Sequence, residues 1–281
     1  MPPASTDLMR DCTARLAIVP VLLGLLVLAP QQSLAAEQGR LAQAEALFKR
    51  RCATAGERIT RTVKDVEGIF LLKVRPKPVQ DDEQYRLDDP YGSDLGGQDY
   101  IQSFLKAHYE LPERMRHLRL PHRTYQPQTQ FGYDFVDTVD PKSGARMRYT
   151  AYVEQPGKTD PSYSLNYFRV VVESSPTKEP APRYGVTYDD ISTREDRAFW
   201  IAGSSLRVID LRDGTVIAER IGYMMDRGQG SSSGGRLPWL HATFHACPAF
   251  DGPHPPSRQR GQTDRFVEKV LLPKRELRQD R

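Results

Sequence analysis

Two strand-like runs on either side of Asp213-Gly214 constrain the fold more than any other feature of this 281-residue chain. Residues 205–211 and 215–225 are rich in β-branched and other apolar side chains, which favour strands. Asp-Gly between two such runs indicates a hairpin turn. A left-handed Gly214 after a type I turn would place Arg207 opposite Glu219, a register that an ion pair would favour, and a two-residue turn is the alternative.

This hairpin resembles the strand pair in the blades of propeller proteins that bind a quinone cofactor. It occurs once, whereas a propeller repeats its blade motif several times along the chain. No cofactor is therefore expected.

The surrounding sequence extends the β pattern in both directions. Residues 140–144 contain Pro and Gly and predict a turn between two further strands. The Pro-rich stretch 174–182 is expected to be a linker that does not pair in a sheet. The remaining predicted strands are 68–74, 131–139, 146–153, 164–173, 184–191 and 199–202.

The first part of the exported chain has a different period. Leu41, Ala44, Leu47 and Phe48 have helical spacing and predict an amphipathic helix within 36–65, with a break at Gly56 as the alternative. Residues 76–130 are irregular, with one short helix expected near 100–108. The predicted class is α+β and mainly β: an N-terminal amphipathic helix packed on an antiparallel β-meander, sandwich or curled sheet.

The N-terminus has the features of a secretory signal peptide. Arg10 and Arg15 precede the 15-residue apolar run 16–30, and small residues follow it up to Ala36. An uncleaved membrane anchor is the alternative, but Pro20 interrupts the run and a spanning helix needs about 20 residues. We therefore expect residues 1–35 to be removed and residues 36–281 to form a single domain, periplasmic or secreted, with no transmembrane segment after cleavage.

The cysteines follow from this export prediction. Cys12 would leave with the signal peptide, so the exported protein keeps Cys52 and Cys247 in an oxidising compartment. We predict a disulfide between them. Two separately buried thiols are the alternative.

Ser232 lies in Gly230-Ser231-Ser232-Ser233-Gly234, which formally matches the G-x-S-x-G pattern of a nucleophile elbow. An elbow needs a helix directly after the serine, and here Gly235 and Pro238 follow. A surface loop is the favoured interpretation.

The segment after this loop contains possible metal ligands: His241, His245, Cys247 and His254. Both a helix and a strand would put the first two histidines on one face, so their spacing does not select a metal site. The disulfide accounts better for the cysteine. No metal site and no catalytic residue is assigned, and these histidines and Ser232 stay as alternatives.

Charge restricts the class of partner. Forty Lys and Arg against 36 Asp and Glu give a net charge of +4, too small for a dense nucleic-acid-binding field. Acidic residues near Asp94 lack the spacing of a calcium-binding loop and predict a solvated loop. We therefore expect no nucleic-acid partner.

The sequence favours a non-enzymatic exported protein that uses loops and a tyrosine-bearing sheet face to bind a protein or cell-envelope ligand. An inhibitor or immunity-type protein fits this description. The alternative is a periplasmic hydrolase that uses the loops within 228–254. A concavity that gathers Ser232 or the histidines with a carboxylate would favour the hydrolase.

Overall fold

The computed structural model describes residues 37–77, 94–105, 132–165, 167, 169–250 and 259–274. The chain divides into two compact units, Met1–Ala46 and Leu47–Arg281. In the first unit the described residues are helical, and the helix continues in the second unit to residue 52. The predicted signal peptide lies outside the described residues.

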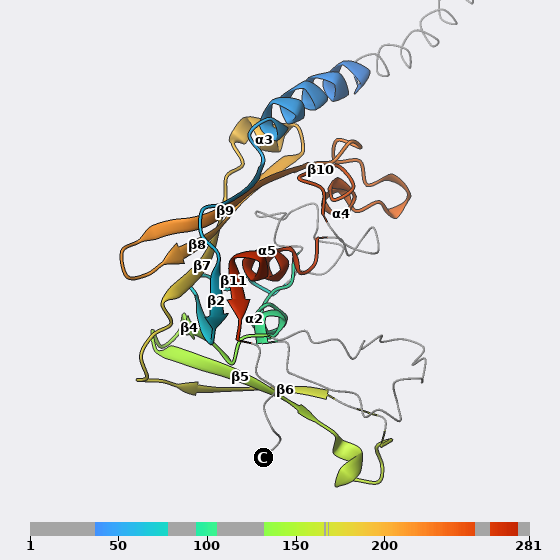
Figure 1. Cartoon of the computed structure of the whole chain (residues 1–281). Helices are drawn as coiled ribbons and strands as arrows, with labels where there is room; N and C mark the ends of the chain where they lie inside the picture. The colour runs from blue at the N-terminus through green and yellow to red at the C-terminus, as the bar shows by residue number, and fades with distance from the viewer. Residues whose placement is uncertain are drawn as a thin grey trace, which may run out of the picture. The chain divides into compact units, whose positions relative to one another are not determined.

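The second unit is built on a nine-stranded mixed sheet (Figure 1). Its order is β1 (Gly56–Ile59), β9 (Thr215–Met225), β8 (Ile201–Asp210), β7 (Tyr184–Asp190), β3 (Gly68–Leu71), β4 (Phe135–Val139), β5 (Arg146–Glu154) and β6 (Arg169–Pro176), with β10 (Ala246–Cys247) paired to β9. The α+β, mainly β class is confirmed.

The sheet is mixed rather than antiparallel, which corrects the predicted meander. β3 lies between β4 and β7 and runs parallel to both. Its sequence GIFL is a continuous apolar run, and Ile69 and Leu71 are fully buried. Such a run is typical of a parallel strand covered on both faces, whereas half-exposed antiparallel strands alternate.

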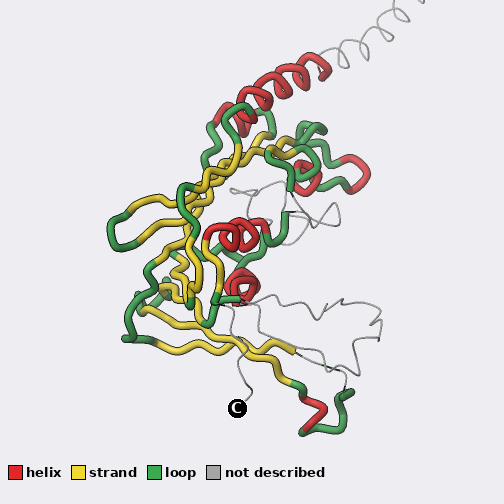
Figure 2. The backbone as a smooth tube through the Cα atoms, in the orientation of Figure 1, coloured by secondary structure: helices red, strands yellow, loops and turns green. Residues whose placement is uncertain are grey.

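The β8–β9 hairpin forms in the predicted register. Gly214 has a φ of 75°, and its N–H donates to the Asp210 carbonyl. A bulge between Val208 and Ile209 follows, and Arg207 lies opposite Glu219. Figure 2 shows the turn at the hairpin tip in green. The predicted position of Arg207 opposite Glu219 is therefore confirmed. The register shift that produces it lies between Val208 and Ile209 rather than at Gly214, and Arg207 forms its ion pair with Asp189 on β7 instead of Glu219.

Two helices cover one face of this sheet. α2 (Gln98–Leu105) buries Tyr100, Ile101, Phe104 and Leu105, and α5 (Gln262–Val270) buries Phe266, Val267 and Val270. These side chains form one core with Val136, Val186, Leu206 and Val208 of the sheet. The short helix expected near 100–108 is thus confirmed over Gln98–Leu105.

The segment after the N-terminal helix departs from the prediction. Helix was expected up to residue 65, but residues 53–55 leave the helix and two strands follow: β1, which pairs with β9, and β2 (Val63–Val66), which pairs in parallel with β11 (Leu271–Pro273). Ile59, Thr60, Thr62 and Val63 are β-branched and favour extended backbone.

The Pro-rich segment also begins later than predicted. Ser174, Ser175 and Pro176 continue β6 and lie opposite Tyr149, Arg148 and Met147. β6 is the last strand of the sheet, and an edge strand tolerates proline because one side of its backbone needs no ladder hydrogen bond. Residues 177–183 then connect β6 to β7.

Candidate functional site

A groove among the described residues lies where β3 and β4 end. Both strands run parallel, so their carboxyl ends meet at one edge of the sheet, next to the start of α2. The groove has a volume of ≈ 760 Å³. Ligands of sheets with parallel strands often bind at this position, outside the carboxyl ends of adjacent strands.

The walls of the groove are mainly apolar and aromatic. Leu72 follows β3 and is 43% exposed, and Val139 ends β4 and is 46% exposed. Their side chains therefore offer apolar surface to a ligand. The lining is completed by Val74, Pro76, Ile101, Pro141, Tyr149, Val172 and Tyr188 together with the polar or small residues Lys73, Arg75, Gly97, Gln98, Thr138, Asp140 and Ser174.

A buried arginine supports the aromatic wall. Arg75 has no exposed surface, and its guanidinium carbon lies 3.9 Å from the centre of the Tyr188 ring. Arg75 Nε also lies 4.0 Å from Asp94 Oδ2. A guanidinium stacked on an aromatic face holds the ring in one orientation and gains cation–π attraction. Tyr188 is thus a preorganised wall of the groove.

Asp94 connects the groove to α5. Its carboxylate accepts hydrogen bonds from the Gly261 N–H at 2.6 Å and from Thr263 Oγ1 at 2.7 Å. The side chain has no exposed surface. The prediction of a solvated acidic loop was therefore wrong for Asp94, because its oxygens cap the start of α5 instead of facing water.

A second set of charges flanks the groove. Lys73 and Arg207 both pair with Asp189. The hydrogen bond from Lys73, followed by the positive charge of the two cations, lowers the pKa of Asp189. Asp189 therefore remains ionised and holds Lys73 at the groove rim.

The described lining of the groove offers contacts for binding. It contains two aliphatic hydroxyls, Thr138 and Ser174, and one carboxylate, Asp140, and no histidine is among these described residues to act as a base. Hydrolysis by a serine needs a base within hydrogen-bond distance of the nucleophile.

Ser232 lies away from this groove, in the loop 226–236. The loop is held by Asp226, which is fully buried and accepts hydrogen bonds from the N–H groups of Gly228 and Gly230 and from Arg236. Ser232 itself is exposed and precedes a short 3₁₀ turn, Ser233–Gly235. The strand–serine–helix geometry of a nucleophile elbow is therefore not formed.

The histidines are not assembled into a site in the described part of the chain. His241 lies in α4 (Pro238–Ala242), where Nδ1 is 2.9 Å from the Leu237 carbonyl oxygen and the ring contacts Phe244. His245 uses its backbone carbonyl to accept a bond from Met225. His254 lies outside the described residues. Within the described ranges, no three His, Cys, Asp or Glu side chains are grouped as metal ligands.

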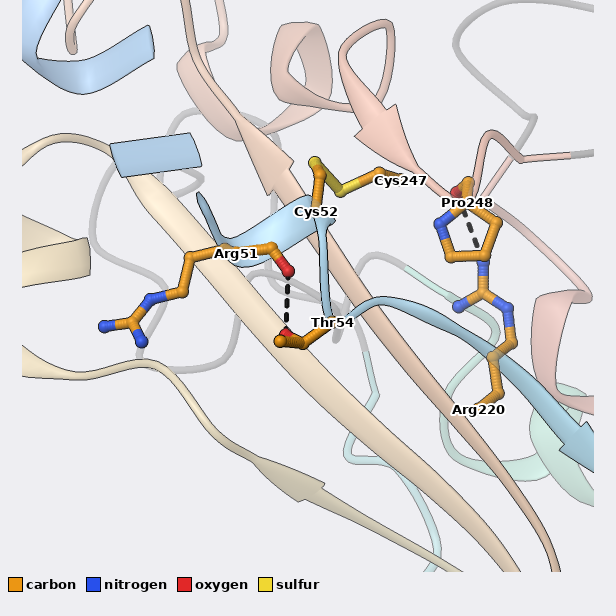
Figure 3. The surroundings of a disulfide bond; sticks show 6 residues. All are labelled: Arg51, Cys52, Thr54, Arg220, Cys247 and Pro248. Carbon is orange, nitrogen blue, oxygen red and sulfur yellow. Dashed lines mark hydrogen bonds between the residues drawn. A yellow bond between two sulfur atoms is a disulfide. The ribbon is translucent and has the colours of Figure 1, made fainter. Parts of the chain in front are cut away.

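The predicted disulfide is confirmed (Figure 3). Cys52 at the end of the helix bonds to Cys247 of β10, with a Cα–Cα distance of 5.6 Å. Its neighbour Arg51 donates to Asp196 of α3 (Arg194–Ala198) at 2.8 Å. Desolvation would raise the pKa of Asp196, but the bonds from Arg51 and Thr193 outweigh it and lower that pKa.

A second, smaller hollow of ≈ 450 Å³ lies beside the disulfide-linked segment. Arg220 of β9 is 4% exposed and lines it, donating to Gln262 at 3.2 Å. Arg220 also donates to the Pro248 carbonyl at 3.4 Å (Figure 3). Glu57 lies 3.6 Å from Arg220 and also pairs with Lys269. The Glu57 carboxylate thus partly neutralises the positive charge of Arg220 and Lys269 in this hollow.

No family model, curated protein or solved structure matches this chain. None of the helices in the described ranges is both long and apolar enough to span a bilayer.

The residues that form the groove were only partly visible in the sequence. Tyr149 belongs to the predicted strand 146–153, and it does line the groove. Arg75 and Tyr188 were not singled out, and Asp94 was expected in a solvated loop, because the contacts of these residues join distant segments. The available signal was the pair Leu72 and Val139, apolar residues at or just beyond strand ends, where polar residues are usual.

Proposed function

We propose that this chain is an exported, non-enzymatic protein that binds a protein or cell-envelope ligand in the groove at the carboxyl ends of β3 and β4. The observation that carries the proposal is the groove itself, with exposed Leu72 and Val139 beside a tyrosine held by a buried arginine. Rigid aromatic surface adds contact area at a low cost in conformational entropy. An inhibitor or immunity-type protein would use such a surface to cover its target.

Several observations support export. The N-terminal apolar run and the small residues after it fit a signal peptide that ends near Ala35. The Cys52–Cys247 disulfide fits a periplasmic or extracellular location, where such bonds persist. Cys52 and Arg51 attach residues 47–52 to β10 and α3, which supports the further proposal that this end of the helix packs on a curled sheet.

The groove composition supports binding over hydrolysis. The lining has no histidine, and Ser232, His241 and His245 do not line either hollow. A ligand would instead meet apolar side chains with Lys73 at the rim. We therefore expect the ligand to present apolar or aromatic groups next to negative charge.

Site-specific photo-crosslinking tests this proposal. Val139 is replaced by p-benzoylphenylalanine, and the protein is irradiated in living cells that export it. Val216, which is 40% exposed on β9 and outside the groove lining, serves as the matched control. We expect one discrete adduct from position 139, identified by mass spectrometry, and none from position 216.

The adduct at position 139 should weaken when Tyr188→Ala is added, since that change removes the aromatic wall. Equal adducts from both positions, or none from position 139, would overturn the groove as the binding site. A covalently trapped or turned-over small substrate would instead favour the hydrolase.

A further inference from the structure

The outer edge of β6 is open among the described strands. β6 ends the sheet and has β5 as its neighbour, with eight residue pairs from Arg169–Glu154 to Pro176–Met147. The opposite side of its backbone therefore has no strand partner within the described ranges. Such an edge is a template for another strand, and proteins usually block it with charge, bulges or proline.

The sequence of β6 places opposite charges at equal distances from Val171. It reads Arg169-Val-Val-Val-Glu173, with an arginine and a glutamate two residues on either side of the central valine. In antiparallel pairing with an identical strand centred on Val171, each Arg169 lies opposite the partner's Glu173. Val170 then lies opposite Val172, and Val171 faces its own copy.

The surroundings of Arg169 and Glu173 within one molecule fit this register. Arg169 pairs with Glu154 of β5 at 2.6 Å. This ion pair already orients the arginine side chain that a second copy would meet. Glu173 is exposed and has no ion pair among the described residues. Opposite charges placed across strands are favourable, and like charges are unfavourable. A second copy would therefore supply the cation that Glu173 lacks.

We propose that β6 is a self-association surface, through which two copies of this chain pair edge to edge about a two-fold axis at Val171. Pairing with a second copy uses the same edge on both molecules, so the assembly closes at two and does not grow into a fibre. Pro176 lacks an N–H and limits the length of the new ladder.

Charge reversal tests the register. In Glu173→Arg each copy has arginines at both positions, and in Arg169→Glu each has glutamates at both, so either homodimer faces like charge with like charge. We expect the protein, purified as cells produce it, to be a dimer by light scattering and sedimentation. Each single variant should associate about tenfold more weakly or worse.

Mixing the two single variants is the decisive measurement. A heterodimer of Glu173→Arg with Arg169→Glu restores both Arg–Glu contacts, so the mixture should dimerise again although neither variant does so alone. The double variant with both reversals should also dimerise. Folding of each variant is checked by near-ultraviolet circular dichroism, so that loss of the dimer is not mistaken for loss of the fold.

A cross-link gives independent evidence for the axis. Val171→Cys should form an intermolecular disulfide under mild oxidation, because the residue faces its own copy. Val216→Cys, exposed on β9, should not.

Three results would overturn the proposal: a wild-type monomer at about 0.1 mM, dimers that persist in both single variants, or a mixture that stays monomeric. A monomer that binds a strand of a different protein along β6 would assign the edge to that protein instead.

Discussion

Asp210 is a buried carboxylate that joins two distant arginines. Arg61 and Arg183 approach its Oδ2 at 2.5 and 2.6 Å, and the aspartate side chain has no exposed surface. The hydrogen bonds from Arg183, and then from Arg61, hold the pKa of Asp210 far below its usual value despite desolvation. This residue therefore fastens the segment after β1 to the β8–β9 turn.

The lowered pKa of Asp210 makes stability depend on pH. Because its pKa is lower in the folded chain than in the unfolded chain, its contribution is complete above about pH 4, the ordinary aspartate value, and is lost as the pH falls toward the folded value. Asp210→Asn should lower the free energy of unfolding at pH 7 and flatten its decline in acid. Urea unfolding from pH 7 to pH 2 measures this; Asp65→Asn, at an exposed position, is the control.

Identical acid profiles for Asp210→Asn and the wild type would show that this carboxylate does not favour the folded state.

Gly230 is a second residue with a specific structural requirement. Its φ is 85°, and an added Cβ would lie 2.2 Å from the Trp200 indole. Gly230→Ala should therefore destabilise the protein by about 2–4 kcal/mol, through crowding and a strained backbone. Gly234→Ala shares the positive φ but has open space around it, so we expect about 1 kcal/mol. Denaturant midpoints compare the two; equal losses would contradict the close contact with Trp200.

At the scale of elements, local patterns were sufficient where the contacts are local. The β8–β9 hairpin and the β4–β5 hairpin were both predictable, because turn residues and alternation specify them within about 20 residues of sequence. The position of β3 was not predictable, because its partners β4 and β7 come from residues 135–139 and 184–190. Nothing local in GIFL identifies those neighbours.

The groove was hidden for the same reason. Leu72, Val139 and Tyr188 meet only after β3 takes its place between β4 and β7. The disulfide was predictable by counting, since the proposed export would leave two cysteines. Its location beside β9 required the strand order.

The disulfide links elements at opposite ends of the chain. Cys52 and Cys247 are separated by 195 residues, so the bond removes much of the freedom of the unfolded chain. On the chain-entropy estimate it contributes at most about 5 kcal/mol. Cys52→Ser with Cys247→Ser should lower the urea midpoint without changing the far-ultraviolet spectrum. Dithiothreitol should reproduce this shift in the wild type; no shift in either case would contradict a stabilising role.

At the scale of the whole molecule, the first prediction concerns the mature chain. We expect the exported protein to begin at or near Ala36, because the small residues before it suit signal peptidase. Intact mass spectrometry of protein purified from the periplasm or the medium measures this. A mass that retains residues 16–30 would overturn the cleaved, exported form.

The placement of β2 and β3 has a consequence for the order in which the molecule can fold. Both strands are made early, but β2 pairs with β11 at residues 271–273, and Leu71 of β3 faces Val186. A chain that leaves a ribosome or a translocation channel N-terminus first must keep these apolar segments unpaired until most of it has emerged. Long-range pairing of this kind slows folding and exposes such segments to aggregation. Complete pairing of these strands therefore has to wait until residues 271–273 have emerged, and a chaperone that shields GIFL during that interval would raise the yield.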